Sequence, residues 1–581
     1  MKRSVNIPKQ PEKSRPAATP KAAAAAPATW SPAWWHWALG FVLVLFVAFE
    51  VYGPALKGEF LFDDSYLPFF MVGDGPFSQW MGVRPFLMIS YWLNYKTTGL
   101  DPYPYHAVNV VFHAVNGILA GLVVRRVLAW TGETGWKREA LAAFSGALFL
   151  LHPVQTESVA YVASRSEAMS IFFFLSAFAV FVYRRDTAAS LGRAIAVLLL
   201  FGIACTVKEH TTVLPALLLL TDYFVITPFA FTAIRKNWKL YGMIVAAAVV
   251  GLAAVAKVLA GAQTAGFKIK EFTWYEYLFT QFRVIWLYLR LYVAPFGQSA
   301  DYEFSISRSI VDGGSMVALL GLVALAVVAW WYRRAFPLAA LGYFGFLILL
   351  APTSSVVPIR DVAVERRLYL PFICLLFITV DFLRRWTVAR GTMIGILSAV
   401  CVVAGGLSYQ RNHVWGSALA LWTDTVEKAP GNARAVFQLA HAQWLNGQCG
   451  QAAATYERVS KMDKIDERLL IDWALALECA NRVDEAAAKI RQAMQAQPTA
   501  HGYSQLGMIY GKHARANEAL EALAMAEKLD PRFEMTYVYR GNVYASRGEM
   551  PQAVAEYQRA LALNPNSAQA QQGLAAVQLR R

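Results

Sequence analysis

Two related segments decide the fold of the C-terminal third: GYSQLGMIYGKHARANEALEALAMAEKLDP (502–531) and TYVYRGNVYASRGEMPQAVAEYQRALALNP (536–565). Gly507 and Gly541 occupy equivalent places in the two segments, 34 residues apart. Small residues at such places let two helices approach closely, and proline ends the second helix of each segment. The period therefore predicts a repeating helical hairpin.

Proline spacing extends this period upstream. Pro430, Pro498, Pro531 and Pro565 are separated by 68, 33 and 34 residues. A 34-residue unit of two helices is the tetratricopeptide repeat. We expect about four repeats between 430 and 566, the first two degenerate, within a domain at 410–581. Such arrays bind proteins or peptides or serve as scaffolds, and this one contains no catalytic constellation.

The rest of the chain is too apolar for a soluble fold. The 581 residues are 57% hydrophobic, 14% aromatic and only 16% charged, with a mean hydropathy of +0.36. This is more apolar surface than a globular core can bury. We predict an all-α protein in which a polytopic membrane helix bundle at 34–409 precedes the repeat solenoid. Residues 1–33, rich in Lys, Pro and Ala, are expected to form a disordered cytoplasmic tail. The eleven predicted spans lie near 37–52, 107–128, 140–152, 168–183, 191–207, 211–228, 239–260, 314–332, 336–351, 368–383 and 391–409.

Basic residues predict the topology. The formal net charge is +15, and Lys and Arg are concentrated in the N-terminal tail and in every second loop. By the positive-inside rule the N-terminus is cytoplasmic and the repeats lie outside. The loops alternate between the two sides of the membrane only if 275–294 is not counted as a span. This stretch has two arginines on one helical face and several aromatic residues, which is typical of a helix that lies at the membrane interface. We ascribe the positive charge to topology and to contact with membrane lipids, not to nucleic acid. The basic pairs of the inside loops are Arg125–Arg126, Lys137–Arg138, Arg184–Arg185, Arg235–Lys236, Arg333–Arg334 and Arg384–Arg385.

Several kinds of site are excluded by their missing motifs. The chain has no Walker loop, no dinucleotide-binding glycine turn, no HExxH and no GxSxG. Its five cysteines show no CxxC spacing, and only Cys449 and Cys479 are placed to pair.

An acidic pair stands in the first external loop, 54–106. Asp63 and Asp64 follow the first span between apolar residues, where desolvation raises the proton affinity of a carboxylate. A carboxylate with a raised pKa suits a general base. The alternative is structural, with Asp64 accepting backbone hydrogen bonds at the start of a short helix.

The other external loops carry an unusual number of ionisable residues. Arg366 and Arg367 run against the positive-inside bias, and a phosphate at the headgroup level is their natural partner because guanidinium binds it bidentately. Salt bridges that only pack the loops are the alternative. His106 and His113, seven residues apart, would need an added carboxylate to hold a divalent cation, and structural hydrogen bonds explain them equally well. The remaining candidates are Arg84, His152, Glu157, Arg165, Lys208, Glu209, Asp301, Tyr302 and Glu365.

These motifs, taken in order, resemble a known family. EFLFDDSYLP, VRPFLMISYWLNY, GLDPYPYHAVNVVFHAVN, LHPVQTESVAYVASRSE, VKEHTT, APFGQSADYEF and ERRLYLP, followed by the repeats, are similar to the transmembrane and tetratricopeptide repeat-containing O-glycosyltransferases of the GT-C class. The resemblance covers about 40–581.

The resemblance implies an inverting enzyme that moves a sugar from a polyprenyl phosphate to Ser or Thr hydroxyls of exported proteins. One of the two residues Asp63 and Asp64 would then be the general base. Arg366, Arg367, Lys208 and Arg84 would bind the donor phosphate, with a divalent cation as a possible aid. The other candidates would orient the sugar or the acceptor, and the repeats would recruit the acceptor protein. The small number of repeats fits a bacterial inner-membrane member with periplasmic repeats. Alternatives are a glycolipid or cell-wall glycan as acceptor, or a membrane-anchored scaffold without activity.

Overall fold

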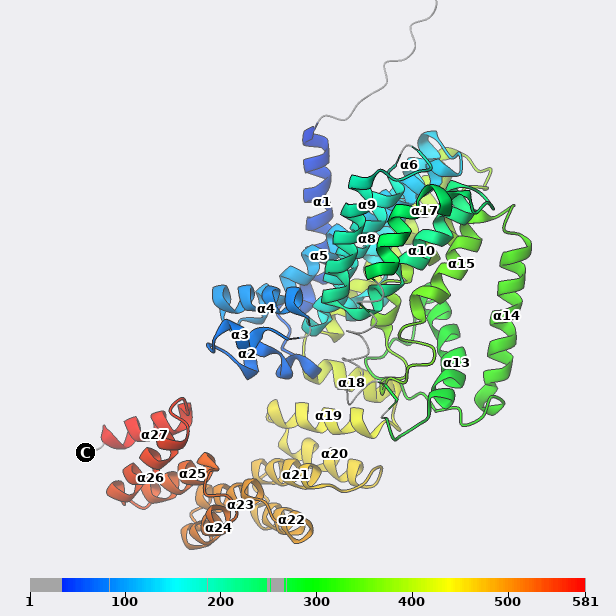
Figure 1. The fold of residues 1–581 in the computed structure, drawn as a ribbon. Coiled ribbons are helices and arrows are strands. Elements are labelled where there is room, and N and C mark those ends of the chain that lie inside the picture. Colours follow the sequence, from blue (N-terminus) through cyan, green and yellow to red (C-terminus); the bar gives the residue numbers. More distant parts are fainter. Residues whose placement is uncertain are drawn as a thin grey trace, which may run out of the picture. The chain divides into compact units, whose positions relative to one another are not determined.

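The fold is all-helical, as the sequence predicts. A computed structural model describes residues 34–82, 84–184, 186–247, 251, 266, 267 and 269–579, and its regular elements are helices (Figure 1). The predicted tail at 1–33, Arg185 and most of 248–260 lie outside the described residues. The first helix, α1 (Trp34–Tyr52), is apolar along its length. The other parts discussed below all belong to one compact unit that begins at Val47.

Ten of the eleven predicted spans coincide with helices, and most of the span predicted at 239–260 lies outside the described residues. Five helical segments are long and apolar enough to cross a membrane, and three shorter apolar helices accompany them. The count of eleven spans and their orientation remain predictions. The long segments contain α1, α5 (Pro102–Trp130), α8 (Arg165–Val182), α14 (Ser315–Trp331) and α17 (Arg390–Val414), and the shorter helices are α9 (Leu191–Val207), α15 (Pro337–Leu350) and α16 (Phe372–Leu383). Two further predicted spans correspond to α6 (Gly135–Leu151) and to α10 (Leu214–Thr221) with its extension Asp222–Ile226.

Helix α5 is central to the bundle because it packs against both α6 and α8. The contact with α6 depends on small residues. A Cβ atom added to Gly146 would lie 2.8 Å from the Gly117 carbonyl oxygen, so any larger residue would force the two helices apart. Close packing at small residues is the usual way in which membrane helices associate.

Short elements between the long helices bring the candidate residues together. Contacts between η2 and η4, between α7 and η8, and between η3 and η8 join loops that are far apart in the sequence. The helix expected at 275–294 is α13 (Trp274–Val293), which begins with a capping box of Thr273 and Glu276. The other elements of this region are η2 (Phe62–Tyr66), α2 (Pro68–Met71), α3 (Phe77–Trp80), α4 (Pro85–Thr98), η3 (Pro153–Gln155), α7 (Thr156–Ala160), η4 (Val162–Ser164), η5 (Glu209–Val213) and η8 (Glu365–Leu368).

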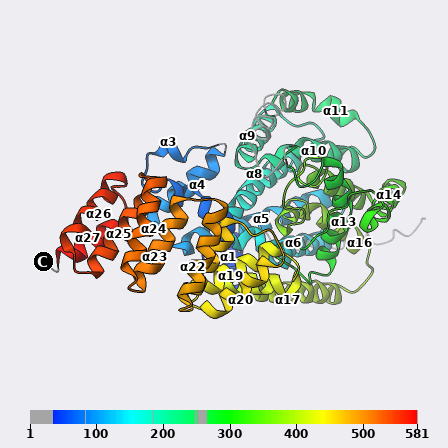
Figure 2. The ribbon, with the colours of Figure 1, turned by 90° about the horizontal axis from the view of Figure 1, so that it is seen from below.

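The C-terminal part consists of paired helices that follow one another along the chain (Figure 2). The first helices of the pairs begin at Ala433, Glu467, Ala500 and Glu534, close to the expected period. Gly541 has the predicted role, since a Cβ there would lie 2.7 Å from the ring of Tyr557 on the partner helix. The helices are α18 (Ala418–Lys428), α19 (Ala433–Leu445), α20 (Cys449–Ser460), α21 (Glu467–Cys479), α22 (Val483–Ala496), α23 (Ala500–Lys512), α24 (Ala516–Leu529), α25 (Glu534–Ser546), α26 (Met550–Leu563) and α27 (Ala568–Gln578).

A disulfide links the first two helix pairs. It joins Cys449 and Cys479, the two cysteines that the sequence singles out, with their Cα atoms 5.5 Å apart. Structural disulfides persist mainly in oxidising compartments such as the periplasm or the secretory lumen.

Candidate functional site

The two residues of the acidic pair have different environments. Asp64 is fully buried in η2, where its two oxygens accept hydrogen bonds from the backbone N–H groups of Leu61 and Ala163, both at 2.8 Å. Burial raises the pKa of Asp64 to about 7, although these two hydrogen bonds oppose the rise. Asp64 thus ties η2 to the start of η4. This is the hydrogen-bonding role that the structural alternative assigns to it.

Asp63 is exposed on the same turn. Its backbone N–H donates to the Tyr161 hydroxyl at 2.9 Å, but its carboxylate has no hydrogen-bond or ion-pair partner among the described residues. The preceding residue, Phe62, has a φ of +48°, which is unusual for a bulky side chain. Its ring lies between those of Tyr161 and Trp422, with centroids 5.5 and 4.8 Å away. The turn therefore presents one free carboxylate.

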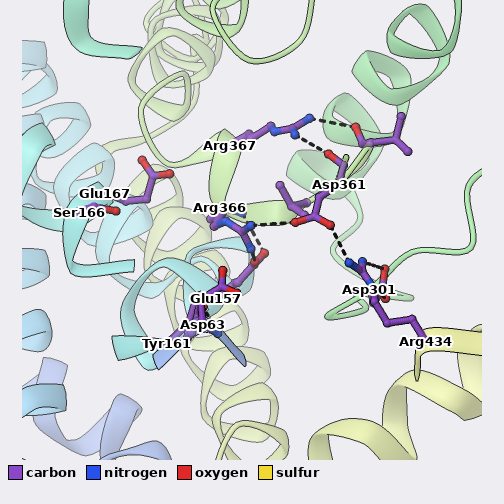
Figure 3. Close-up of polar contacts among 12 residues, drawn as sticks. Asp63, Glu157, Tyr161, Ser166, Glu167, Asp301, Asp361, Arg366, Arg367 and Arg434 are labelled. Carbon is purple, nitrogen blue, oxygen red and sulfur yellow. Dashed lines mark hydrogen bonds and ion pairs between the residues drawn. The ribbon is translucent and has the colours of Figure 1, made fainter. Parts of the chain in front are cut away.

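Arg366 is held by Glu157, and both Arg366 and Asp63 lie close enough to Tyr161 to affect its pKa (Figure 3). The Arg366 guanidinium is 2.5 Å from Glu157 Oε1, and its backbone N–H donates to Oε2 at 3.0 Å. A longer contact of 3.4 Å joins Arg366 to Asp361. Burial alone would lower the pKa of Arg366, but attraction by Glu157 and Asp361 raises it above its ordinary value. The guanidinium is therefore permanently charged and only partly buried, with its side chain 25% exposed.

Arg367 points away from this position. It donates to the Tyr277 hydroxyl at 3.1 Å, to the Val362 carbonyl at 2.9 Å and to the Asp361 carbonyl. These bonds fasten the loop before η8 to α13. Among the described residues, Arg366 forms ion pairs with carboxylates, whereas Arg367 binds a tyrosine hydroxyl and two backbone carbonyls.

A second group of charges surrounds Glu167 at the start of α8. Lys208 forms an ion pair with Glu167, and Arg84 binds Glu209 bidentately at 2.8 and 3.0 Å. Burial lowers the pKa of Lys208; Glu167 opposes this, and the nearby charges of Arg84 and Arg366 lower it further. The three cations are therefore close enough to repel one another; Arg84 and Lys208 each have one carboxylate partner, and Arg366 has two. An anionic ligand could replace part of that compensation.

Arg165 is fully buried and holds neutral groups. Its guanidinium donates to the Asn109 side chain at 3.1 Å and to the carbonyls of Ser90 and Tyr105 at 3.2 and 3.0 Å, and it stacks over Tyr91 with 4.5 Å to the ring centroid. It thus connects α4, α5 and α8. We propose that this connection, and not sugar orientation, is its role.

Removing this guanidinium should therefore affect stability and not catalysis. In Arg165→Ala the Asn109 side-chain oxygen and the two carbonyls lose their hydrogen-bond donor. Each buried acceptor left unsatisfied lowers the free energy of unfolding by about 1–3 kcal/mol. We expect a clearly lower Tm in detergent and an unchanged KM for the sugar donor per folded molecule. A raised KM at unchanged Tm would instead indicate contact with the sugar.

The candidate histidines have protein partners. His106 Nε2 lies 3.3 Å from the Gly58 carbonyl, and His152 Nε2 lies 3.0 Å from the Tyr292 carbonyl. His113 contacts the hydroxyls of Tyr52 and Tyr369 at 3.1 and 2.8 Å. The part of the chain that the structure describes contains no group of three or more His, Cys, Asp or Glu placed to hold a metal ion. We therefore assign none of these residues to a divalent cation.

Glu365 organises the loop that contains Asp301 and Tyr302. It is fully buried and accepts hydrogen bonds from the Ser299 backbone at 3.0 Å, the Tyr302 hydroxyl at 2.7 Å and the Gln298 amide at 2.5 Å. Asp301 does not face the acidic pair, since both its oxygens bind Arg434 of α19 at 2.7 and 2.8 Å. Glu365, which directly precedes Arg366, thus holds the loop that contains Asp301 and Tyr302 in place.

The carboxyl group of Glu365 makes the free energy of unfolding depend on pH. Burial raises its pKa from 4.5 to about 7, so the folded chain keeps a proton that the unfolded chain releases in this range. A raised carboxyl pKa therefore costs the folded state about 3 kcal/mol as the pH rises from 4.5 to 7, and no more above that. We expect Tm to fall more steeply over this range in the wild type than in Glu365→Gln. Parallel Tm curves would contradict the assignment.

Two residues of this region could not be selected from the sequence. Tyr161 lies beside the acidic pair in space, but it is one of 26 tyrosines and its local sequence does not distinguish it. Arg434 stands in a repeat helix, where a solvated arginine is the ordinary expectation. Only the tertiary structure brings it to Asp301 and Asp361, at 2.7 and 3.0 Å.

Parts of this sequence are similar to known proteins. The family model described as TPR repeat matches residues 541–580. Protein O-mannosyl-transferase F38B6.6 of Caenorhabditis elegans is 23% identical over 396 residues, 65% of this chain and 54% of the relative. Protein O-mannosyl-transferase TMTC1 of Mus musculus is 31% identical over 148 residues, 22% of this chain and 15% of the relative. Among solved structures, the match to the TPR protein YrrB covers 31% of this chain and 88% of YrrB, at 17% identity and a TM-score of 0.23.

These matches confirm the resemblance drawn from the motifs. The chain spans about half the length of the nematode relative and a smaller share of the mouse one. The chain is similar to protein O-mannosyl-transferases, among them the TMTC proteins, and it contains a TPR repeat.

Proposed function

We propose that this chain transfers a sugar from a polyprenyl-phosphate donor to Ser or Thr hydroxyls of exported proteins, with Asp63 as the general base. One observation carries the proposal: a carboxylate without a partner among the described residues and the paired cation Arg366 both lie close enough to Tyr161 to affect its pKa, in a chain similar to protein O-mannosyl-transferases. A free carboxylate and a phosphate-binding cation are the two groups that such a transfer needs.

The reaction is a single displacement with inversion. The acceptor oxygen forms a bond to the anomeric carbon while the bond from that carbon to the phosphate oxygen breaks. The Asp63 carboxylate takes the hydroxyl proton, and the lipid phosphate leaves with the electron pair. Asp64 holds the turn rigid through its two backbone hydrogen bonds, so that Asp63 is presented without a large reorganisation cost.

The donor phosphate would be bound by cations that already have carboxylate partners. Arg366, Lys208 and Arg84 are proposed to share their remaining donors with the phosphate, which stabilises the charge that develops on the leaving group. Arg366 is the best placed, because its side chain is one-quarter exposed and, like Asp63, lies close enough to Tyr161 to affect its pKa. Arg367 acts through the loop that it fastens.

The repeats are proposed to recruit the acceptor. A cavity of about 780 Å³ lies along α23 and α25, the first helices of two successive pairs, and along α27, which follows the last pair. Its lining mixes Lys512, Tyr539 and Asn542 with amide side chains of α27, a set of donors and acceptors that suits an extended peptide backbone.

We further propose a bacterial inner-membrane location with the repeats in the periplasm. The basic pairs between predicted spans support a cytoplasmic N-terminus. The Cys449–Cys479 disulfide in the repeats is consistent with an oxidising compartment.

The proposal is tested by mass spectrometry of exported proteins. Cells that lack the gene are complemented with wild-type protein or with Asp63→Asn, and peptides are searched for hexose additions on Ser and Thr. We expect modified peptides with the wild type only. This result would also identify the acceptor and the mass of the sugar.

Two outcomes would count against the proposal. Identical modification in both complemented strains would remove Asp63 as the base. An unchanged glycoproteome with an altered glycolipid profile would transfer the activity to a lipid or glycan acceptor.

A further inference from the structure

Arg434, in the first repeat helix α19, binds two acidic residues of the external loops at once. It binds Asp301 bidentately at 2.7 and 2.8 Å, and its third nitrogen lies 3.0 Å from Asp361. The attraction of these two carboxylates raises the pKa of Arg434, against the effect of burial. A single exposed ion pair contributes little to the stability of a protein. Arg434, however, neutralises two neighbouring carboxylates at once.

Asp361 is shared between two arginines, as Figure 3 shows. Its Oδ1 contacts Arg434 at 3.0 Å, and its Oδ2 contacts Arg366 at the longer distance of 3.4 Å. Arg366 already has a full carboxylate partner in Glu157. If Arg434 were absent, Asp361 would be free to shorten its 3.4 Å contact with Arg366 and become a second close carboxylate partner.

The loop 298–303 supports the same arrangement from the other side. Lys428 donates to the Gln298 carbonyl at 2.8 Å, and the Gly431 backbone N–H donates to Glu303 at 2.9 Å. The opposite side of this loop is bound by Glu365, the residue next to Arg366. The start of the repeat domain therefore contacts the loop at three points, and the loop contacts the arginine segment.

We propose that Arg434 is a positioning residue for the donor-phosphate site: by holding Asp361 it leaves one edge of the Arg366 guanidinium available to an anionic lipid headgroup. The inference rests on the proposed function, because it assumes that Arg366 binds the phosphate. If this is so, the first repeat contributes to binding of the sugar donor, in addition to the role of the repeats in recruiting the acceptor.

The test measures binding of undecaprenyl phosphate to the purified full-length chain in detergent, together with KM and kcat for undecaprenyl-phosphate mannose. In Arg434→Gln we expect about a tenfold rise in both Kd and KM, the size of one charge-assisted hydrogen bond, and a kcat within about threefold of wild type. Adding Asp361→Asn to this variant removes the competing carboxylate, and we expect it to restore Kd and KM to near the wild-type values.

A matched control is Arg482→Gln, which removes an exposed arginine of the same domain whose partner, Glu485, is three residues away. It should leave Kd and KM unchanged. A wild-type Kd in Arg434→Gln would overturn the inference, and so would a double variant without recovery, because a merely structural contact would not be rescued by Asp361→Asn. A wild-type chain that binds no undecaprenyl phosphate would instead overturn the proposed function itself.

Discussion

Asp63→Asn should lower the rate of sugar transfer by about 10²–10⁴-fold, the usual contribution of a positioned general base. Its carboxylate is exposed and has no partner among the described residues, so the amide should leave Tm and donor binding unchanged. The measurement is the initial rate of mannose transfer by the purified chain to the acceptor peptide found by mass spectrometry.

Asp64→Asn is the matched control, with the opposite expectation. Its oxygens accept two backbone N–H groups, and an amide would direct its own N–H₂ at one of them. We expect the free energy of unfolding to fall by about 1–3 kcal/mol, with the remaining folded protein partly active. A stable but inactive Asp64→Asn together with an active Asp63→Asn would reverse the two roles.

Arg366→Ala should have the second-largest effect, because it removes the proposed phosphate ligand and leaves Glu157 unpaired. The Glu157 side chain is only 3% exposed, and breaking a buried ion pair by removing one partner costs about 3–5 kcal/mol. Lost folding would thus obscure lost binding. The informative variant is Arg366→Met with Glu157→Gln, which removes both charges and should recover most of the Tm without recovering affinity for undecaprenyl phosphate.

Arg367→Met separates the two adjacent arginines. Its hydrogen bonds all go to groups within the loop and α13, so we expect a lower Tm and a donor Kd close to wild type. If the Arg366→Met, Glu157→Gln variant binds the donor normally while Arg367→Met does not, the assignment of the phosphate ligand must move to Arg367.

Much of the fold could be read from the sequence because it depends on local patterns. The 34-residue period predicts helix pairs, and in the last two pairs the structure places a glycine against a side chain of the partner helix, Gly507 against Leu523 and Gly541 against Tyr557. Apolar stretches predict helices in the same way, since a backbone in lipid must satisfy its own hydrogen bonds. The two cysteines that form the disulfide are also the two that sequence reasoning selects.

The individual roles within the site required the tertiary structure. Asp63 and Asp64 are adjacent and chemically identical, and only the approach of the Ala163 N–H makes one a structural acceptor and leaves the other free. The same holds for Arg366 and Arg367, which differ through Glu157 and Tyr277, residues about 209 and 90 positions away.

The sequence by itself determined the helical class, the repeat period, the apolar segments and the set of ionisable residues from which the site is built. These depend on the composition and spacing of near neighbours. The tertiary structure decided which acid is free, which arginine is paired with Glu157, and that Arg434 of the first repeat reaches Asp301 and Asp361. Burial and hydrogen bonding act over a few ångströms, so these roles exist only after distant segments have been brought into contact.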